Sequence, residues 1–204
     1  MWMIKPVPSE QMNPLVSVII PNFNHARFLG DAIRSVVGQD YKNVEVIVVD
    51  DGSTDNSREV VEQFGDKVKY IYQENAGLSA ARNTGIRASK GSLIGVLDAD
   101  DMYEPVFLST LVADLQSNPK ADGIYCGYQF VDQKNNLLPQ IEARHVASEL
   151  LYNALLDGNF FVPESIFLHR YVYDEVGLFD EALRACEDWD VWLRVTNKFR
   201  IIHT

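Results

Sequence analysis

Three aspartates stand close together directly after an apolar run of the sequence. Asp98, Asp100 and Asp101 follow segment 92–97, whose length and apolar character predict a buried strand. Carboxylates this close repel one another, and a cation among them would relieve that repulsion. A set of oxygen ligands suits a hard divalent ion, with coordination positions left for phosphate oxygens. The same acids could instead be solvated or cap the next helix, because short acidic motifs recur by chance.

Two further pairs of acids lie where predicted elements end or begin. Asp50 and Asp51 follow the predicted strand 44–49, where a carboxylate can accept hydrogen bonds from a nucleobase imide or a ribose hydroxyl. The Asp-Gly-Ser sequence at this point is also a good turn former. Glu187 and Asp188 open a short predicted helix, and acids in a first turn favour the helix dipole without any chemistry.

Alternating strands and helices must position these residues in the first half of the chain. This alternation predicts right-handed crossovers and a mostly parallel sheet, which carries its ligands at the carboxyl ends of the strands. Pro21 is expected to stop the first strand and turn the following loop toward a ligand. The strands are expected at 15–20, 44–49, 68–72 and 92–97, and the helices at 26–37, 55–64 and 78–89.

The pattern becomes mixed after Asp101. Apolar periodicity predicts helices at 105–115, 147–156 and 187–195, and strands at 123–131, 163–168 and 199–202. Tyr125, Tyr128 and Phe130 are expected to be core residues of the long strand 123–131.

Composition limits the classes of function. The chain has 204 residues, of which 47% are hydrophobic and 23% charged, which fits one globular domain with a real core. The formal net charge of −11 argues against a nucleic-acid polymer as partner but leaves a phosphorylated small molecule open. Cys126 and Cys186 lack a metal-binding spacing and are expected to be unpaired, mostly buried thiols in a reducing compartment.

The ends of the chain carry no evident targeting signal. Residues 1–14 contain three prolines and no apolar core of a signal peptide, so we expect a flexible tail. No apolar run reaches the length of a membrane span. The abrupt end at Thr204 suggests that the natural protein continues.

Five segments, taken in order, closely resemble the motifs of the family 2 glycosyltransferases, which are inverting enzymes with the A-type glycosyltransferase fold. Each motif alone is weak, but their order and their places at predicted strand ends make the resemblance strong. It extends from about residue 15 to the end of the chain. The segments are 17–24 (SVIIPNFN), 48–55 (VVDDGSTD), 75–85 (NAGLSAARNTG), 97–101 (LDADD) and 177–189, which contains GLFDE and CEDW.

The resemblance implies a single α/β domain over 15–204, with a Rossmann-like, mostly parallel central sheet flanked by helices. Residues 15–101 would form the nucleotide-sugar-binding half and residues 102–204 the acceptor-side half. The implied reaction is metal-dependent transfer of a sugar from a nucleoside diphosphate donor, by preference a UDP-sugar, to an acceptor hydroxyl. A glycan or a lipid-linked molecule would be the acceptor. Cell-surface polysaccharide or glycan synthesis, in the cytoplasm or at the inner face of the membrane, would be the setting.

On the donor side, the resemblance places Pro21 and Asn22 in the nucleoside pocket and Asp50 at the base, with Asp51 as a further candidate. Gly77 would allow a close backbone approach to the ligand. Arg82 would hold the acids in place by an ion pair or would contact the ligand itself.

At the reacting centre, the resemblance makes Asp100 the first metal ligand and Asp101 a second one. Asp98 would bind hydroxyl groups of the ribose or sugar, or the metal. Alternation along an extended segment places Asp98 and Asp100 on one side. Mn²⁺ and Mg²⁺ suit these oxygens equally. Asp188 would be the general base, with Glu187 and Trp189 on the acceptor side.

Two rival functions remain open. A sugar nucleotidyltransferase also uses acidic metal sites, but it usually carries a basic, glycine-rich loop after the first strand, which residues 21–25 do not provide. A catalytically inactive nucleotide-binding scaffold would keep the same motifs. The weaker metal candidates His145 and His169 are more simply explained as surface or core histidines.

Overall fold

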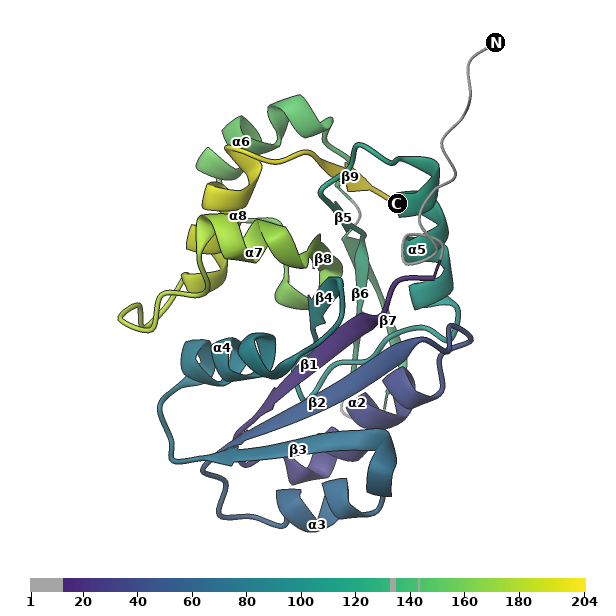
Figure 1. Cartoon of the computed structure of the whole chain (residues 1–204), viewed down its shortest axis with the longest axis vertical. Helices are drawn as coiled ribbons and strands as arrows, with labels where there is room; N and C mark the ends of the chain where they lie inside the picture. Colours follow the sequence, from purple (N-terminus) through teal and green to yellow (C-terminus); the bar gives the residue numbers. More distant parts are fainter. Residues whose placement is uncertain (1–12, 133–134, 143) are drawn as a thin grey trace.

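The computed structural model describes residues 13–132, 135–142 and 144–204, which form a central sheet with helices on both faces (Figure 1). We expected a flexible tail over residues 1–14, and residues 1–12 of it lie outside the described residues. Within the described residues the strand order of the main sheet is β3-β2-β1-β4-β8-β5-β9. Its strands are β1 (Val16–Asn22), β2 (Val44–Asp51), β3 (Val68–Gln73), β4 (Leu93–Val96), β5 (Gly123–Tyr125), β8 (Ile166–His169) and β9 (Ile201–His203).

The helices divide between the two faces of this sheet. One face packs against α2 (Ala26–Val37), α3 (Ser57–Glu62) and α5 (Phe107–Ser117) through one cluster of buried apolar side chains. A second cluster joins the other face to the remaining helices. These are α4 (Leu78–Ala88), α6 (Ser148–Leu156), α7 (Arg170–Val176) and α8 (Glu187–Thr196).

The first half confirms the predicted alternation of strands and helices. β1, β2, β3 and β4 are all parallel, and α2 has the predicted bounds. The expectation that Pro21 stops β1 is wrong, because Pro21 and Asn22 continue the ladder opposite Val49 and Asp50. On its other side β1 pairs with β4 only as far as Ile19, so Pro21 lies at a margin of the sheet where proline is tolerated.

The second half departs further from the prediction. The long strand expected at 123–131 is broken at residues 126–127 into β5 and β6 (Tyr128–Val131), and β6 forms a separate two-stranded ribbon with β7 (Leu137–Glu142). Because this ribbon stands away from the core, Phe130 is 42% exposed rather than buried, whereas Tyr125 is a core residue as expected. The strand expected at 163–168 begins with a 3₁₀ turn, η2 (Pro163–Ser165), before β8.

The remaining expectations concern thiols and membranes. Both cysteines are free, but Cys186 is exposed at the residue before α8, so the expectation of two buried thiols is wrong for it. Among the described residues, no helix combines the length and the apolar character needed to cross a bilayer.

Candidate active site

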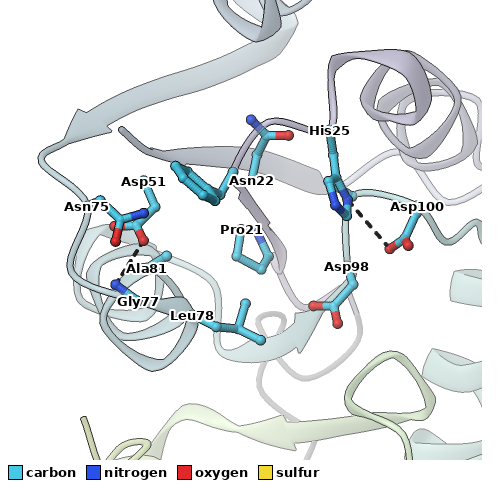
Figure 2. A pocket seen from close by; sticks show the side chains of 12 residues that line it. Pro21, Asn22, His25, Asp51, Asn75, Gly77, Leu78, Ala81, Asp98 and Asp100 are labelled. Atoms are coloured by element: carbon cyan, nitrogen blue, oxygen red, sulfur yellow. Dashed lines mark hydrogen bonds and ion pairs between the residues drawn. The ribbon is translucent and has the colours of Figure 1, made fainter. Parts of the chain in front are cut away.

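A pocket of about 430 Å³ opens at the carboxyl ends of β1, β2 and β4, beside the start of α4 (Figure 2). The predicted loops therefore meet at one edge of the sheet, as parallel topology requires. Phe23, His25 and Asn75 also line this pocket and were not predicted from the sequence. The predicted residues in its lining are Pro21, Asn22, Asp51, Gly77, Asp98 and Asp100.

Asp50 and Asp51 are adjacent on β2 and therefore project to opposite faces of the sheet. Asp50 is buried away from the pocket, where its carboxylate accepts hydrogen bonds from the Tyr70 hydroxyl at 2.6 Å and the Ser53 N–H at 2.9 Å. Burial, and then this contact with Asp50, raises the pKa of Tyr70. Asp51 lines the pocket, so its carboxylate is the one placed to face a ligand, and the role predicted for Asp50 stays a prediction.

Asp51 also fixes the loop that leads into α4. Its carboxylate accepts hydrogen bonds from the Ala76 and Gly77 N–H groups, both at 2.9 Å, and from the Gln73 side chain at 2.6 Å. Gly77 has φ of +93°, a backbone conformation that side-chain-bearing residues rarely adopt. The loop therefore presents backbone to the pocket because glycine permits this turn and Asp51 holds it.

Arg82 joins the two halves of the candidate site from inside α4. It is only 1% exposed, and its guanidinium donates to Glu187 at 2.8 Å and to both oxygens of Asp98 at 3.1 Å. The ring of Phe179 lies 5.2 Å from the guanidinium carbon. Of the two roles predicted for Arg82, the structure shows the ion pair. This pair links Asp98, after β4, to Glu187 at the start of α8.

The acidic segment after β4 is a turn rather than an extended strand. The Asp101 N–H donates to the Asp98 carbonyl oxygen at 3.1 Å, so the strand alternation expected for Asp98 and Asp100 does not apply. Asp98 is directed to Arg82, whereas Asp100 faces the His25 ring, with 4.0 Å between Asp100 Oδ1 and His25 Nδ1. Figure 2 shows both carboxylates at the same side of the pocket.

Glu164, in η2, is a fourth carboxyl group at this turn and was missed from the sequence. Its Oε1 atom is buried without a hydrogen-bond partner among the described residues. Burial, followed by repulsion from Asp98 and Asp101, raises its pKa well above the usual value. Asp101 is exposed as a whole residue, but its carboxyl group is largely shielded from water. This burial, followed by repulsion from Asp100 and Asp98, raises the pKa of Asp101 to about 6.

This accumulation of carboxyl groups fits a hard divalent cation in its chemistry. The donors are all oxygens, and after burial, mutual repulsion between these carboxyl groups is a cause of the raised pKa of Asp101 and Glu164, which a cation would relieve. As they stand, the described residues contain no group of three or more acids, histidines or cysteines arranged to hold a metal. A cation here would therefore need further oxygens, from water or from a bound ligand, to complete its coordination.

Asp188 lies in the first turn of α8, and neither pocket found at this edge is lined by it. Its Oδ2 accepts a hydrogen bond from the Asn159 side chain at 2.9 Å. Trp189 is fixed by donating from its indole Nε1 to the Leu155 carbonyl oxygen at 2.8 Å. Glu187 lines a second cavity of about 310 Å³, which shares Gly77 and Leu78 with the first pocket.

His145 and His169 lie away from this site. His145 stacks on His203 with 4.9 Å between ring centroids, and His169 stacks on Tyr171 at 5.5 Å. Neither ring lines the two pockets, which agrees with the interpretation of both residues as surface or core histidines.

Known proteins resemble this chain in sequence. The model of glycosyl transferase family 2 matches residues 17–177. An uncharacterized glycosyltransferase of Rickettsia prowazekii is 37% identical over 191 residues, covering 89% of this chain and 58% of the relative. The uncharacterized glycosyltransferase EpsJ of Bacillus subtilis is 34% identical over 188 residues, covering 87% and 54%. The chain thus spans little more than half of these curated relatives.

Solved structures share the fold. S. aureus TarS 1–349, in complex with UDP, superposes with a TM-score of 0.77 at 22% identity, covering 93% of this chain and 57% of that one. The mannosyltransferase PcManGT from Pyrobaculum calidifontis, in complex with GDP-Man and Mn²⁺, gives 0.69 at 22% identity, covering 94% and 55%. The predicted A-type glycosyltransferase fold is thereby confirmed. With its motifs at one sheet edge and a family match over most of its length, this chain belongs to glycosyl transferase family 2.

Proposed function

We propose that this chain binds a nucleoside diphosphate sugar at the edge of β1, β2 and β4 and transfers the sugar, with inversion, to an acceptor hydroxyl. The observation that carries the proposal is the ion-pair bridge of Arg82. It fixes Asp98 at the nucleotide-side pocket and Glu187 beside Asp188, so the donor-side and acceptor-side acids share one buried cation. Cell-surface polysaccharide or glycan synthesis is the setting that we propose.

The pocket is suited to a nucleotide. Its volume of about 430 Å³ lies within the ordinary range for small-ligand sites, and Asp51, Asn22 and loop backbone supply polar contacts. We assign the base and ribose to this region. Two proteins that share this fold have been solved with such molecules, TarS with UDP and UDP-GlcNAc and PcManGT with GDP-Man, which supports a nucleoside diphosphate sugar as donor. We propose a uridine nucleotide as the first candidate.

Asp100, with Asp98 and Asp101, would hold a divalent cation together with the donor diphosphate. Mn²⁺ is present in the complex of PcManGT, which supports a metal-dependent reaction. A bound Mn²⁺ or Mg²⁺ would disperse the negative charge that develops on the departing nucleotide.

The chain's own residues would then serve a single displacement. The acceptor oxygen forms a bond to the anomeric carbon while the bond from that carbon to the diphosphate oxygen breaks, and its electron pair leaves with the nucleotide. The acceptor proton passes to the carboxylate of Asp188. Attack opposite the leaving group inverts the anomeric carbon. The second cavity, beside Glu187, is the place that we propose for the sugar or the approaching acceptor.

Donor hydrolysis tests this function without knowledge of the acceptor. The protein is incubated with UDP-GlcNAc, UDP-glucose, UDP-galactose or GDP-mannose and Mn²⁺, and free nucleotide is measured. We expect release from one donor, its loss with a chelator, and its loss in Asp100→Ala. Asp188→Asn should lower the rate by about 10² to 10⁴ while calorimetry shows unchanged UDP affinity.

Other outcomes identify the rivals. Tight UDP binding without release under any of these conditions would favour a nucleotide-binding scaffold. Formation of pyrophosphate from a nucleoside triphosphate and a sugar phosphate would favour a nucleotidyltransferase. Full activity of Asp188→Asn would reject Asp188 as the base.

A further inference from the structure

The three acids in the first turn of α8 have different partners. Glu187 pairs with Arg82 at 2.8 Å, and Asp190 pairs with Arg194 at 2.7 Å. Asp188 instead accepts a hydrogen bond from a neutral amide, and among the described residues its carboxylate has no cationic partner within ion-pair distance. A carboxylate paired with a buried cation is a poor proton acceptor, because the cation stabilises its charged form. Asp188 is therefore the acid of this turn whose carboxylate no described cation holds.

The amide that contacts Asp188 belongs to Asn159, in the loop after α6, and its orientation is fixed from both ends. Asn159 Oδ1 accepts the Phe161 N–H at 3.1 Å, which leaves Nδ2 to donate to Asp188 Oδ2 at 2.9 Å. Exchanging the oxygen and nitrogen of the amide would break both contacts. No hydrogen bond reaches Asp188 Oδ1 from the described residues, so this oxygen is available to an acceptor.

The loop that carries Asn159 is itself anchored to α8. Phe161 is only 3% exposed, and its ring lies 4.6 Å from that of Tyr125 and 6.4 Å from that of Trp192. The Trp189 indole donates to the Leu155 carbonyl oxygen near the end of α6, which ties the same loop to the first turn of α8. Asn159 is exposed, but its position relative to Asp188 is set by buried neighbours on either side.

We propose that Asn159 is a positioning residue for the reaction. It holds Oδ2 of Asp188 with a neutral donor, so that Oδ1 points to the acceptor hydroxyl and keeps its ability to accept a proton. Orientation of a reacting group within a few tenths of an ångström affects rates strongly, and a neutral hydrogen bond provides it without a neutralising charge. This inference rests on the proposed function, in which Asp188 is the base.

The kinetic test compares variants in the release of UDP or GDP from the donor that the wild-type protein hydrolyses. Asn159→Ala should lower kcat about tenfold, with the donor KM unchanged within about twofold, because only the orientation of the base is lost. Asn159→Asp should lower kcat by about 10² or more, because a second carboxylate then opposes Asp188. Asn159→Gln keeps the NH₂ donor and should recover part of the rate. Asn153→Ala, an exposed asparagine of α6, is the matched control and should leave kcat unchanged.

Two further measurements separate positioning from a general structural role. In the Asp188→Asn background, Asn159→Ala should have no further effect on kcat, since there is no base left to orient. In ¹H–¹⁵N spectra, the side-chain NH₂ signals of Asn159, assigned by their loss in Asn159→Ala, should shift in Asp188→Ala. They should stay in place in Asp190→Ala.

Each failure has its own meaning. Three results would overturn the role of Asn159 alone. The first is an unchanged kcat in Asn159→Ala, and the second is that Asn159→Ala lowers kcat equally in the Asp188→Asn background. The third is that the Asn159 NH₂ signals do not shift in Asp188→Ala. An active Asp188→Asn protein would remove both the base and its positioning residue. Absence of release from every donor by the wild-type protein would reject the proposed function, and with it this inference.

Discussion

The parallel part of the sheet and the part added by β5, β8 and β9 build the candidate site in different ways. β1, β2 and β4 bring their loops to one edge through backbone topology, and the acids there are held by hydrogen bonds within the same half, as with Asp51 and Gly77. α8 and the loop after α6 reach the site through side-chain contacts from other elements. The proposed donor side is thus fixed by backbone topology. On the proposed acceptor side, apolar packing holds α8 against the sheet, and a few polar links fix its acidic first turn.

These links are concentrated on α4. Besides the Arg82 bridge, Asn83 donates to the Phe179 carbonyl oxygen and to Glu181, and accepts the Phe179 N–H. Consecutive residues of one helix therefore hold the segment that precedes α8. The proposed acceptor side should therefore be sensitive to the loss of single polar contacts, whereas the proposed donor side should be disturbed mainly when strands or their packing change.

Arg82→Met should have the largest effect. It leaves Asp98 and Glu187 without their buried cation and should lower the free energy of unfolding by about 3–5 kcal/mol, measured by urea titration. Arg87→Met is the control, because Arg87 is exposed on the same helix and pairs with Glu181 at 3.6 Å. The control should cost less than about 1 kcal/mol. Equal costs for the two variants would mean that the bridge does not join the two parts.

Gly95→Ala should disturb the junction between the two parts of the sheet. A Cβ at Gly95 would lie 2.3 Å from ring atoms of Phe167, its partner on β8. Overpacking of this kind typically costs about 1–3 kcal/mol, and calorimetric melting would measure it. Phe167→Leu in the same protein should recover part of the loss. Gly30→Ala, which meets nothing closer than 3.4 Å, should be neutral or stabilising. A harmless Gly95→Ala would show that the junction adapts freely.

Asp55→Ala tests how firmly the first half holds its loops. Asp55 accepts the Ala26 N–H at the start of α2, and the N–H and hydroxyl of Ser57 at the start of α3. We expect a loss of about 1–2 kcal/mol in urea titration, as for helix caps. Burial would raise the pKa of Asp55, but these hydrogen bonds outweigh it and lower the pKa.

Because its folded-state pKa lies below 3.8, the contribution of Asp55 is present above that pH and is lost as the pH falls through the folded-state pKa. The difference between the wild-type and Asp55→Ala proteins should therefore shrink in acid. A constant difference down to low pH would contradict this origin.

His169→Gln should have the smallest effect, at the end of β8. Burial lowers the pKa of His169 below its usual 6.5, so the unfolded chain takes up a proton more readily than the folded one. The free energy of unfolding should therefore decrease as the pH drops below 6.5. Between pH 7 and 5 this decrease should be smaller in His169→Gln than in the wild-type protein, by less than about 1 kcal/mol. Parallel curves for the two proteins across this range would rule out a contribution from His169.

The sequence alone determined the first half of the fold and the edge at which the site lies. The alternation of apolar strands and amphipathic helices is local, so α2 and the four parallel strands could be predicted within one or two residues at each end. The acids that follow β2 and β4 had to meet at one edge, because parallel strands point the same way.

The other features could not be predicted, because they depend on contacts between segments that are far apart in the chain. Strand alternation puts Asp50 and Asp51 on opposite faces, but it does not say which face is left open beside α4. The break between β5 and β6 depends on β8 and β9, which pair with β5 from far along the chain. Glu164 lies in a segment that the sequence predicts as a strand, and Asn159 lies in a loop, in both cases outside the motifs. They acquire a part in the site only through their contacts with Asp98, Asp101 and Asp188.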